Sequence, residues 1–137
     1  MSDRVLSKRP ADFVWRDQPA LSGGAEHATL LGDPASPGRY VFRLRVPAGH
    51  RARPHWHPDE RIYTVLSGTF YLGFGHDRSD DDLEEYPQGS VLIVRAERLH
   101  FQLAKAGPYE VQVEGEGPTA VEYETPADDP RRSTSHP

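Results

Sequence analysis

The stretch that decides the fold is residues 49–68, which read GHRARPHWHPDERIYTVLSG. Its second part, residues 61–66, is rich in β-branched and aromatic side chains and is typical of a strand. A Ser-Gly turn follows, and residues 69–74 return as a second strand, so the pair is predicted to form a hairpin. The first part contains His55 and His57. In a strand, side chains two residues apart point to the same face, so both imidazoles can reach one metal ion.

Further strands are predicted on both sides of this hairpin. Residues 40–46 alternate apolar and charged side chains and stop at a Pro-Ala-Gly turn. The remaining strands are expected at residues 90–94, 100–103, 109–113 and 121–123. Turn residues separate the strands, and no segment carries a sustained helical period. The chain is therefore predicted to be all-β, as a sandwich or a barrel.

Composition restricts the protein to a narrow set of classes. The 137 residues are enough for one domain, and the lack of cysteine excludes disulfides and thiolate metal sites. Twenty-one acidic residues against 16 basic ones give a formal net charge of −5, which argues against a nucleic-acid partner. No apolar run is long enough to span a membrane, and residues 1–8 do not resemble a signal peptide. We expect a cytoplasmic protein that contacts neither nucleic acid nor membrane.

Two segments have the composition of solvated surface. Residues 77–85 hold six acidic side chains and one basic one, without the glycine and helices of a calcium loop, and are predicted to be a loop. Residues 125–137 are rich in proline and charge and are predicted to form an extended or disordered tail. The expected organisation is a barrel with an N-terminal strand over residues 1–124, followed by the tail at 125–137.

The spacing of glycine and histidine resembles the two motifs of the cupin family. Gly49 is followed by five residues and then by His55 and His57, with Gly68 after ten more residues. In the second motif, Gly89 precedes His100 by ten intervening residues. The similarity extends from about residue 11 to about residue 131. It includes the sequence of residues 55–68, which looks like that of small bacterial single-domain cupins.

This resemblance implies a fold and a metal site. The implied fold is a single-domain jelly-roll barrel, the double-stranded β-helix of cupins. The implied site is one divalent metal ion in the barrel mouth, held by His55, His57 and His100. Fe(II) is the favoured ion, with Zn, Ni, Mn and Cu as alternatives. The resemblance also implies a two-fold symmetric homodimer that pairs through residues 11–15 and 40–46.

The first motif departs from the family at the glutamate, whose place is taken by Arg61, with Glu60 one residue earlier. On an unbroken strand Arg61, rather than Glu60, would share the face of His57, but Pro58 is expected to break that strand. We favour the three histidines as ligands, with Glu60 as their outer partner; Glu60 as a fourth ligand is the alternative. Arg61 is expected to lean outward in a surface ion pair with Asp59 or Glu60, or else to bind an anion.

The second motif departs at three positions, where Arg95, Glu97 and Ala104 stand for the proline, glycine and asparagine. The strand and its histidine remain.

Other side chains are candidates by position. Gln102 shares the face of His100 and could orient a substrate, and Tyr63 could offer its phenol; core or rim positions are the alternatives. Arg43 and Arg45 are predicted to point outward, with binding of a substrate carboxylate as the alternative. His50 is a further candidate for a fourth ligand.

Three functions follow from the resemblance. The leading prediction is an Fe(II) dioxygenase acting on a small organic molecule, because three neutral histidines leave positions open for substrate and dioxygen. The same site with a non-redox ion would act as a Lewis acid in a cyclase, isomerase or lyase. A non-catalytic protein that binds a small molecule is the third. Glu60, Tyr63 and Gln102 are the candidate catalytic residues beside the metal.

Overall fold

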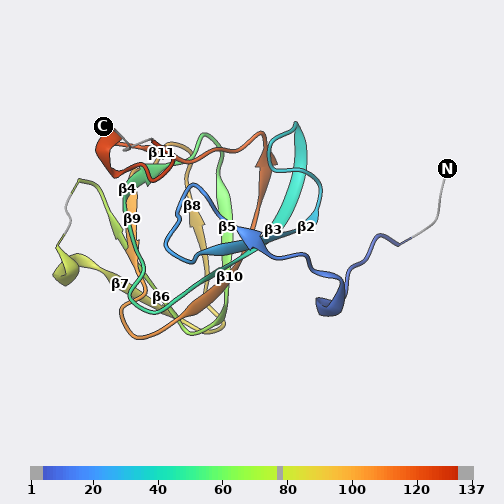
Figure 1. Cartoon of the computed structure of the whole chain (residues 1–137), viewed down its shortest axis with the longest axis horizontal. Helices are drawn as coiled ribbons and strands as arrows, with labels where there is room; N and C mark the ends of the chain where they lie inside the picture. The colour runs from blue at the N-terminus through green and yellow to red at the C-terminus, as the bar shows by residue number, and fades with distance from the viewer. Residues whose placement is uncertain (1–4, 77–78, 133–137) are drawn as a thin grey trace, which may run out of the picture.

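The computed structural model describes residues 5–76 and 79–132, which fold into two antiparallel sheets (Figure 1). The larger sheet has the strand order β1 (Arg16–Asp17), β2 (Glu26–Leu31), β3 (Gly38–Val46), β10 (Tyr109–Gly117), β5 (Arg61–Ser67) and β8 (Val91–Val94). The smaller sheet has the order β11 (Glu122–Tyr123), β4 (Arg51–Trp56), β9 (His100–Leu103), β6 (Thr69–Phe74) and β7 (Glu84–Pro87). The helical elements of the described residues are the 3-10 turns η1 (Pro10–Asp12), η2 (Asp80–Asp82) and η3 (Pro126–Asp128).

The pairing of the strands is that of a jelly roll. β3 pairs with β10, β4 with β9, β5 with β8 and β6 with β7, as in one long hairpin whose tip lies between β6 and β7. Alternate pairs belong to alternate sheets, and the contacts of β10 with β5 and of β9 with β6 join them. The two sheets therefore face each other around one core, and the predicted all-β jelly roll is confirmed.

The core follows the period of two that the sequence shows. Inward side chains of both sheets form one buried cluster, which includes Tyr40, Phe42, Leu44, Val46, Tyr63, Val65, Phe70, Leu72, Tyr109, Val111 and Val113. Between them on β3, Arg43 and Arg45 point outward, as expected. Their guanidinium carbons lie 5.0 Å from the ring centre of Phe13 and 3.8 Å from that of Trp15, respectively.

The segment around Phe13 and Trp15 covers the outer face of β2 and β3. Both rings pack against a second buried cluster of Ala28, Leu30 and Val41. The two parts of the predicted dimer contact, residues 11–15 and 40–46, thus pack against each other within one chain, and the dimer stays a prediction. The N-terminal segment reaches past the barrel in Figure 1.

Two strands were not anticipated. β2 lies in a stretch whose strand pattern is weak, and β7 contains Glu84 and Glu85, which were assigned to an acidic loop. β7 is the edge strand beside β6, where its acidic side chains stay in solvent, so they are compatible with sheet pairing. Residues 77–78 of that predicted loop lie outside the described residues.

The C-terminal segment does not run freely into solvent where the structure describes it. Residues 126–128 form η3, and the Nη2 of Arg131 donates to the backbone oxygen of Val121 at 2.6 Å. Asp129 accepts from the backbone and side chain of Arg131 and helps to hold this return. Residues 125–132 are therefore held to the rest of the chain by these contacts, and residues 133–137 lie outside the described part, so the assignment of residues 125–137 to a tail stays a prediction.

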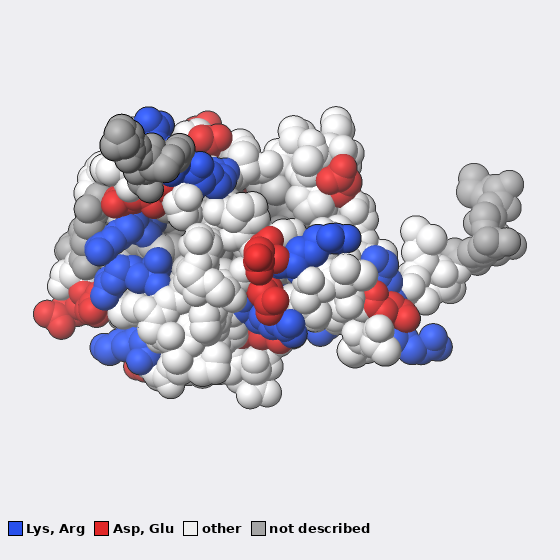
Figure 2. Space-filling model, viewed as in Figure 1, with Lys and Arg blue, Asp and Glu red and all other residues white. Residues whose placement is uncertain are grey.

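Charge is mixed over the surface. Figure 2 shows acidic and basic side chains interspersed on the face in view, without a continuous basic field. Within residues 5–76 and 79–132, no helix has the length and apolar character needed to cross a membrane.

The turn at Gly68 makes the first prediction. Gly68 has a φ of +70°, and a Cβ there would overlap the backbone oxygen of Pro108. Gly49 has a φ of +81° but open space around it. Gly49→Ala should therefore cost only the strain of the backbone, about 1–2 kcal/mol. Gly68→Ala should cost about 1–3 kcal/mol more, because neighbouring backbone must move. Urea unfolding of both variants measures the difference, and equal losses would contradict this account.

Candidate metal centre

Three histidines meet on the inner face of the smaller sheet. His55 on β4 lies directly opposite His100 on β9 in the strand register, and His57 follows one residue after the end of β4. One ring nitrogen from each of the three lies within 4.8 Å of the other two, and all three side chains are buried. The strand pairing thus brings together the three residues that the motif spacing singled out.

Hydrogen bonds to the backbone orient all three rings. Each Nδ1 donates to a carbonyl oxygen: His55 to Arg53 at 2.7 Å, His57 to Ala120 at 2.8 Å and His100 to Arg98 at 2.8 Å. Because a carbonyl oxygen can only accept, Nδ1 carries the proton and Nε2 is left with its lone pair. Metal-binding histidines usually show this arrangement, in which one ring nitrogen donates a hydrogen bond to the protein and the other binds the metal.

The protonation state and an unpaired atom both fit a metal ion. Burial is the main cause that lowers the pKa of His55 and His57 well below 6.5, with His100 and Arg61, respectively, adding to it. Burial also lowers the pKa of His100 to about 4. The rings are therefore neutral at pH 7, as metal ligands must be. The Nε2 of His100 is buried without a hydrogen-bond partner, and a divalent cation between the rings would satisfy it.

The histidines open onto a small cavity. An inner space of about 40 Å³ is lined by His55, His57, Arg61, Tyr63 and Gln102, together with Gln18 and the apolar Leu21, Phe42, Leu44 and Val121. An outer hollow of about 200 Å³ shares Gln18, Phe42, Arg61 and Val121 with it and is further bounded by Pro34, Ala35 and Arg131. The two spaces therefore lie next to each other, on either side of these shared residues.

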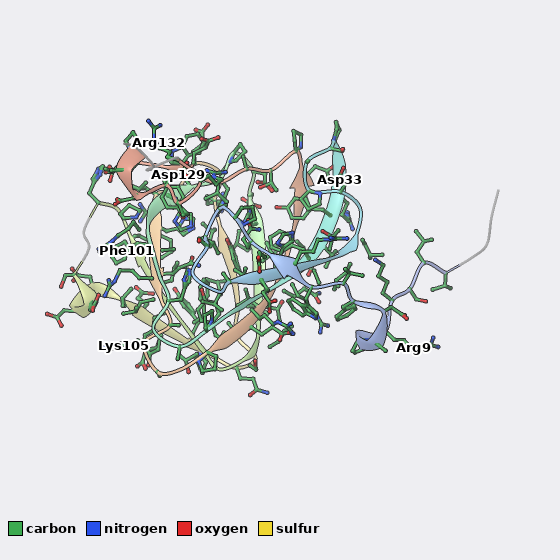
Figure 3. The ribbon with its side chains drawn as sticks, in the orientation of Figure 1. Arg9, Asp33, Phe101, Lys105, Asp129 and Arg132 are labelled. Carbon is green, nitrogen blue, oxygen red and sulfur yellow. The ribbon has the colours of Figure 1, made fainter. Side chains whose placement is uncertain are left out.

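The outer hollow lies toward one end of the barrel. Asp33 and Asp129, which neighbour the lining segments in sequence, lie at the end opposite Lys105 in Figure 3.

Arg61 is where the structure departs most from expectation. Its side chain is buried rather than in a surface ion pair, and only 6% of the residue is exposed. Its Nη1 donates to the hydroxyl of Tyr63 at 3.3 Å and its Nη2 to that of Thr119 at 2.9 Å. The cause is strand parity. Arg61 is the first residue of β5, and inward positions on β5 are Arg61, Tyr63 and Val65.

The same parity places Glu60 outside. Its carboxylate is half exposed and lies 3.4 Å from the Nε of Arg95. Glu60 also lines a separate surface hollow with Arg39 and Ile62. The hypothesis that Glu60 is a ligand or an outer partner of the histidines is therefore wrong in this conformation.

The other candidates are placed as follows. Tyr63 and Gln102 line the cavity, and the side-chain amide of Gln102 donates to the hydroxyl of Tyr109 at 3.0 Å. Their roles toward a substrate stay predictions. His50 does not join the other histidines, because its Nε2 contacts the backbone oxygens of Leu21 at 3.2 Å and Ser22 at 2.9 Å. It holds the loop that covers the cavity.

The sequence indicated Asp59 as a possible partner of a surface-exposed Arg61, but sequence reasoning missed Tyr40, Tyr63 and Thr119. The carboxylate of Asp59 lies 4.0 Å from the Nε of Arg61 and accepts from Tyr40 at 2.6 Å and from Thr119 at 2.5 Å. Burial raises the pKa of Tyr40 to about 12, so its hydroxyl remains a donor. The inward parity of Arg61 was the only available signal, because a buried arginine needs a carboxylate nearby.

Comparisons with known proteins agree with this fold. No family model matches the chain, and no curated protein matches it in sequence. The polyketide cyclase RemF from Streptomyces resistomycificus superposes with a TM-score of 0.72 at 19% identity, over 96% of this chain and 91% of that one. An RmlC-like cupin from Shewanella frigidimarina gives 0.65 at 13% identity, over 85% and 96%.

A third solved structure is similar in fold. The DMSP lyase DddQ from Ruegeria pomeroyi superposes with a TM-score of 0.67 at 21% identity, over 85% of this chain and 63% of that one. Such identities establish the fold alone. The chain therefore has the cupin fold, with a three-histidine group on the inner face of its smaller sheet.

The metal content should depend on the histidines and not on Glu60. His57→Ala removes one of three converging nitrogens and should abolish stoichiometric metal, whereas Glu60→Ala removes only a surface charge. Elemental analysis of both purified variants tests this, with circular dichroism to show that both barrels are folded. Full metal in His57→Ala, or metal loss in Glu60→Ala, would refute this assignment.

Acid should destabilise the metal-free protein. The folded-state pKa of His100, about 4, lies below its unfolded value near 6.5, so the unfolded chain takes up the proton first. The stability linked to this group is fully present above pH 6.5 and is lost as the pH falls toward 4, by up to about 3 kcal/mol. Thermal unfolding of the apoprotein across this range should show a steeper loss in the wild type than in His100→Gln. Parallel curves would speak against a neutral, buried His100.

Proposed function

We propose that the protein is a metal-dependent enzyme that converts a small organic molecule by non-redox chemistry, as cyclases, isomerases and lyases do. The observation that carries this proposal is that two of the three converging, neutral imidazoles, those of His55 and His57, line the same small cavity as the buried Arg61. When bound by the imidazoles, a divalent ion would act as a Lewis acid that polarises a substrate oxygen.

The chain's own groups would assist this chemistry. Arg61 is permanently charged and lines the cavity, so it stabilises negative charge that develops on a substrate oxygen. Tyr63 accepts from Arg61, which leaves its own O–H able to donate into the cavity. Phe42, Leu44 and Val121 exclude water around these groups, which strengthens each electrostatic interaction.

The fold neighbours support this choice. RemF, with a TM-score of 0.72, is a polyketide cyclase, and DddQ, at 0.67, is a DMSP lyase. Both proteins are named for reactions of the class proposed here, although the low identities transfer no substrate.

Fe(II)-dependent dioxygenation, the leading prediction from sequence, is the second candidate. The all-histidine group without a carboxylate supports it, because a neutral ligand set favours a bound anionic substrate. Arg61 weighs against it. A fixed positive charge close to a metal ion disfavours the loss of an electron from that ion.

Reconstitution with single metals separates the two chemistries. The apoprotein would be loaded with Zn²⁺ or with Fe(II) and assayed with and without oxygen, on a panel of 1,3-dicarbonyl compounds, phenols and hydroxy acids. We expect turnover by the zinc protein under nitrogen, loss of that turnover in His57→Ala and its retention in Glu60→Ala.

Two other outcomes have clear meanings. Turnover that requires both iron and oxygen would replace the Lewis-acid reaction by dioxygenation. Tight binding of panel compounds without conversion under any condition would identify a small-molecule-binding protein and refute the enzyme.

A further inference from the structure

The cavity beside the histidines has an unbalanced charge pattern. Its inner and outer linings include the cationic side chains of Arg61 and Arg131 but no aspartate or glutamate. Arg131 is neutralised by Asp129, whose carboxylate lies 2.9 Å from its Nε. Arg61, whose ion pair with Asp59 is long at 4.0 Å, is therefore the least compensated charge that lines the cavity.

The hydrogen bonds of Arg61 are incomplete. A guanidinium has five N–H donors, and its Nε is buried without a partner. Asp59 is too distant from that nitrogen for a hydrogen bond, at 4.0 Å, and its oxygens already accept from Tyr40 and Thr119. An arginine that is 94% buried pays a large desolvation cost, and this arrangement offsets that cost only in part.

The guanidinium is nevertheless held in one orientation. Its Nη1 and Nη2 donate to Tyr63 and Thr119, and its central carbon lies 5.5 Å from the ring centre of Phe42. A charged group that is fixed before a ligand arrives loses little entropy on binding it. Arginine also matches a carboxylate better than any other cation, because its planar fork can bind two oxygens.

The rest of the cavity restricts what accompanies that anion. Phe42, Leu44, Leu21 and Val121 provide apolar walls, and the histidines offer a place for a second oxygen. The inner space of about 40 Å³ and the outer hollow of about 200 Å³ are each smaller than the roughly 300–1,000 Å³ of sites for drug-sized ligands, so the ligand must be compact.

We infer that Arg61 is the specificity-determining residue of this site and that the substrate is a compact oxo- or hydroxycarboxylate. Its carboxylate pairs with Arg61, its carbonyl or hydroxyl oxygen faces the three histidines, and its carbon skeleton lies against Phe42. Calling this molecule a substrate rests on the proposed function. The selectivity of the site for a carboxylate does not depend on turnover.

A pair of matched probes tests the inference on the zinc-loaded protein. Salicylate carries a carboxylate and a hydroxyl on a compact ring, and salicylamide has the same shape without the charge. Calorimetric titration should show that the wild type prefers salicylate. Arg61→Gln should reduce that preference by about tenfold to a hundredfold, the value of a charged hydrogen bond. Arg95→Gln, which removes a surface arginine beside Glu60, should leave the preference unchanged.

Further variants separate recognition from folding. Arg61→Gln leaves Asp59 buried without its cation, so the double variant Asp59→Asn/Arg61→Gln removes both charges and should restore stability but not the preference. Arg61→Lys keeps the charge without the fork and should retain part of the preference. Thermal unfolding and zinc content are measured alongside for each variant.

The outcomes are decisive in both directions. Three results would overturn the inference: equal affinity of the wild type for the two probes, no measurable binding of salicylate, or a preference for salicylate that survives both in Arg61→Gln and in Asp59→Asn/Arg61→Gln. A preference that disappears in those variants, in a protein that converts no tested compound, would sustain the inference and refute the proposed enzyme.

Discussion

The site depends on the pairing of β4 with β9. In this register His55 lies directly opposite His100, so two imidazoles meet from neighbouring strands without any loop to position them. The hydrogen bonds from Nδ1 of His55 and His100 to the carbonyl oxygens of Arg53 and Arg98 then fix the orientation of each ring. His57 joins through a different route, because its Nδ1 donates to Ala120, in the segment that precedes β11. The geometry is therefore set by backbone groups, which point mutations in side chains elsewhere do not remove.

A second constraint ties Arg61 to the same framework. Its burial is tolerable because its sequence neighbours Asp59 and Tyr63 surround it together with Tyr40 and Thr119, which come from distant parts of the chain. Tyr40 and Tyr63 belong to the larger sheet, whereas the histidines belong to the smaller one or its margin. The cavity lies between a sheet that supplies neutral nitrogen ligands and a sheet that supplies a fixed cation. Closing the jelly roll is what brings these two chemistries together.

Much of this arrangement was predictable from period-two patterns. The alternation of apolar and polar residues predicted β3, β5 and β10. The spacing of His55, His57 and His100, which resembles the cupin motifs, predicted the histidine cluster. Strand parity alone also predicts that Arg61 points inward and Glu60 outward. The expected strand break at Pro58 argued against applying this parity. The structure shows why that weighting was wrong. The strands do stop at Trp56 and restart at Arg61, yet each strand keeps its own inward face, so the break does not reverse the outcome.

What the sequence could not supply is contact between distant loops. Thr119 follows a Gly-Pro turn with no periodic signal, and it meets Asp59 and Arg61 across about sixty residues of chain. Leu21 enters the cavity lining because His50 binds the backbone of its loop, an interaction between a histidine and a segment without strand pattern. β2 and β7 were missed for a related reason, since partly exposed strands show only weak alternation.

The substitution at position 61 has a consequence that the fold alone would hide. In the motif that this chain resembles, the position carries a carboxylate, which would lower the total charge at the metal site by one. Arginine instead places a cation at this position, a difference of two unit charges that the carboxylate of Asp59, 4.0 Å from its Nε, offsets in part. With an effective dielectric constant of about 20, one such charge about 5 Å from an anion contributes roughly 3 kcal/mol. An interaction of that size is enough to change which molecules a site admits while every strand of the barrel stays in place, and under the proposed function Arg61 would therefore determine selectivity together with the histidines.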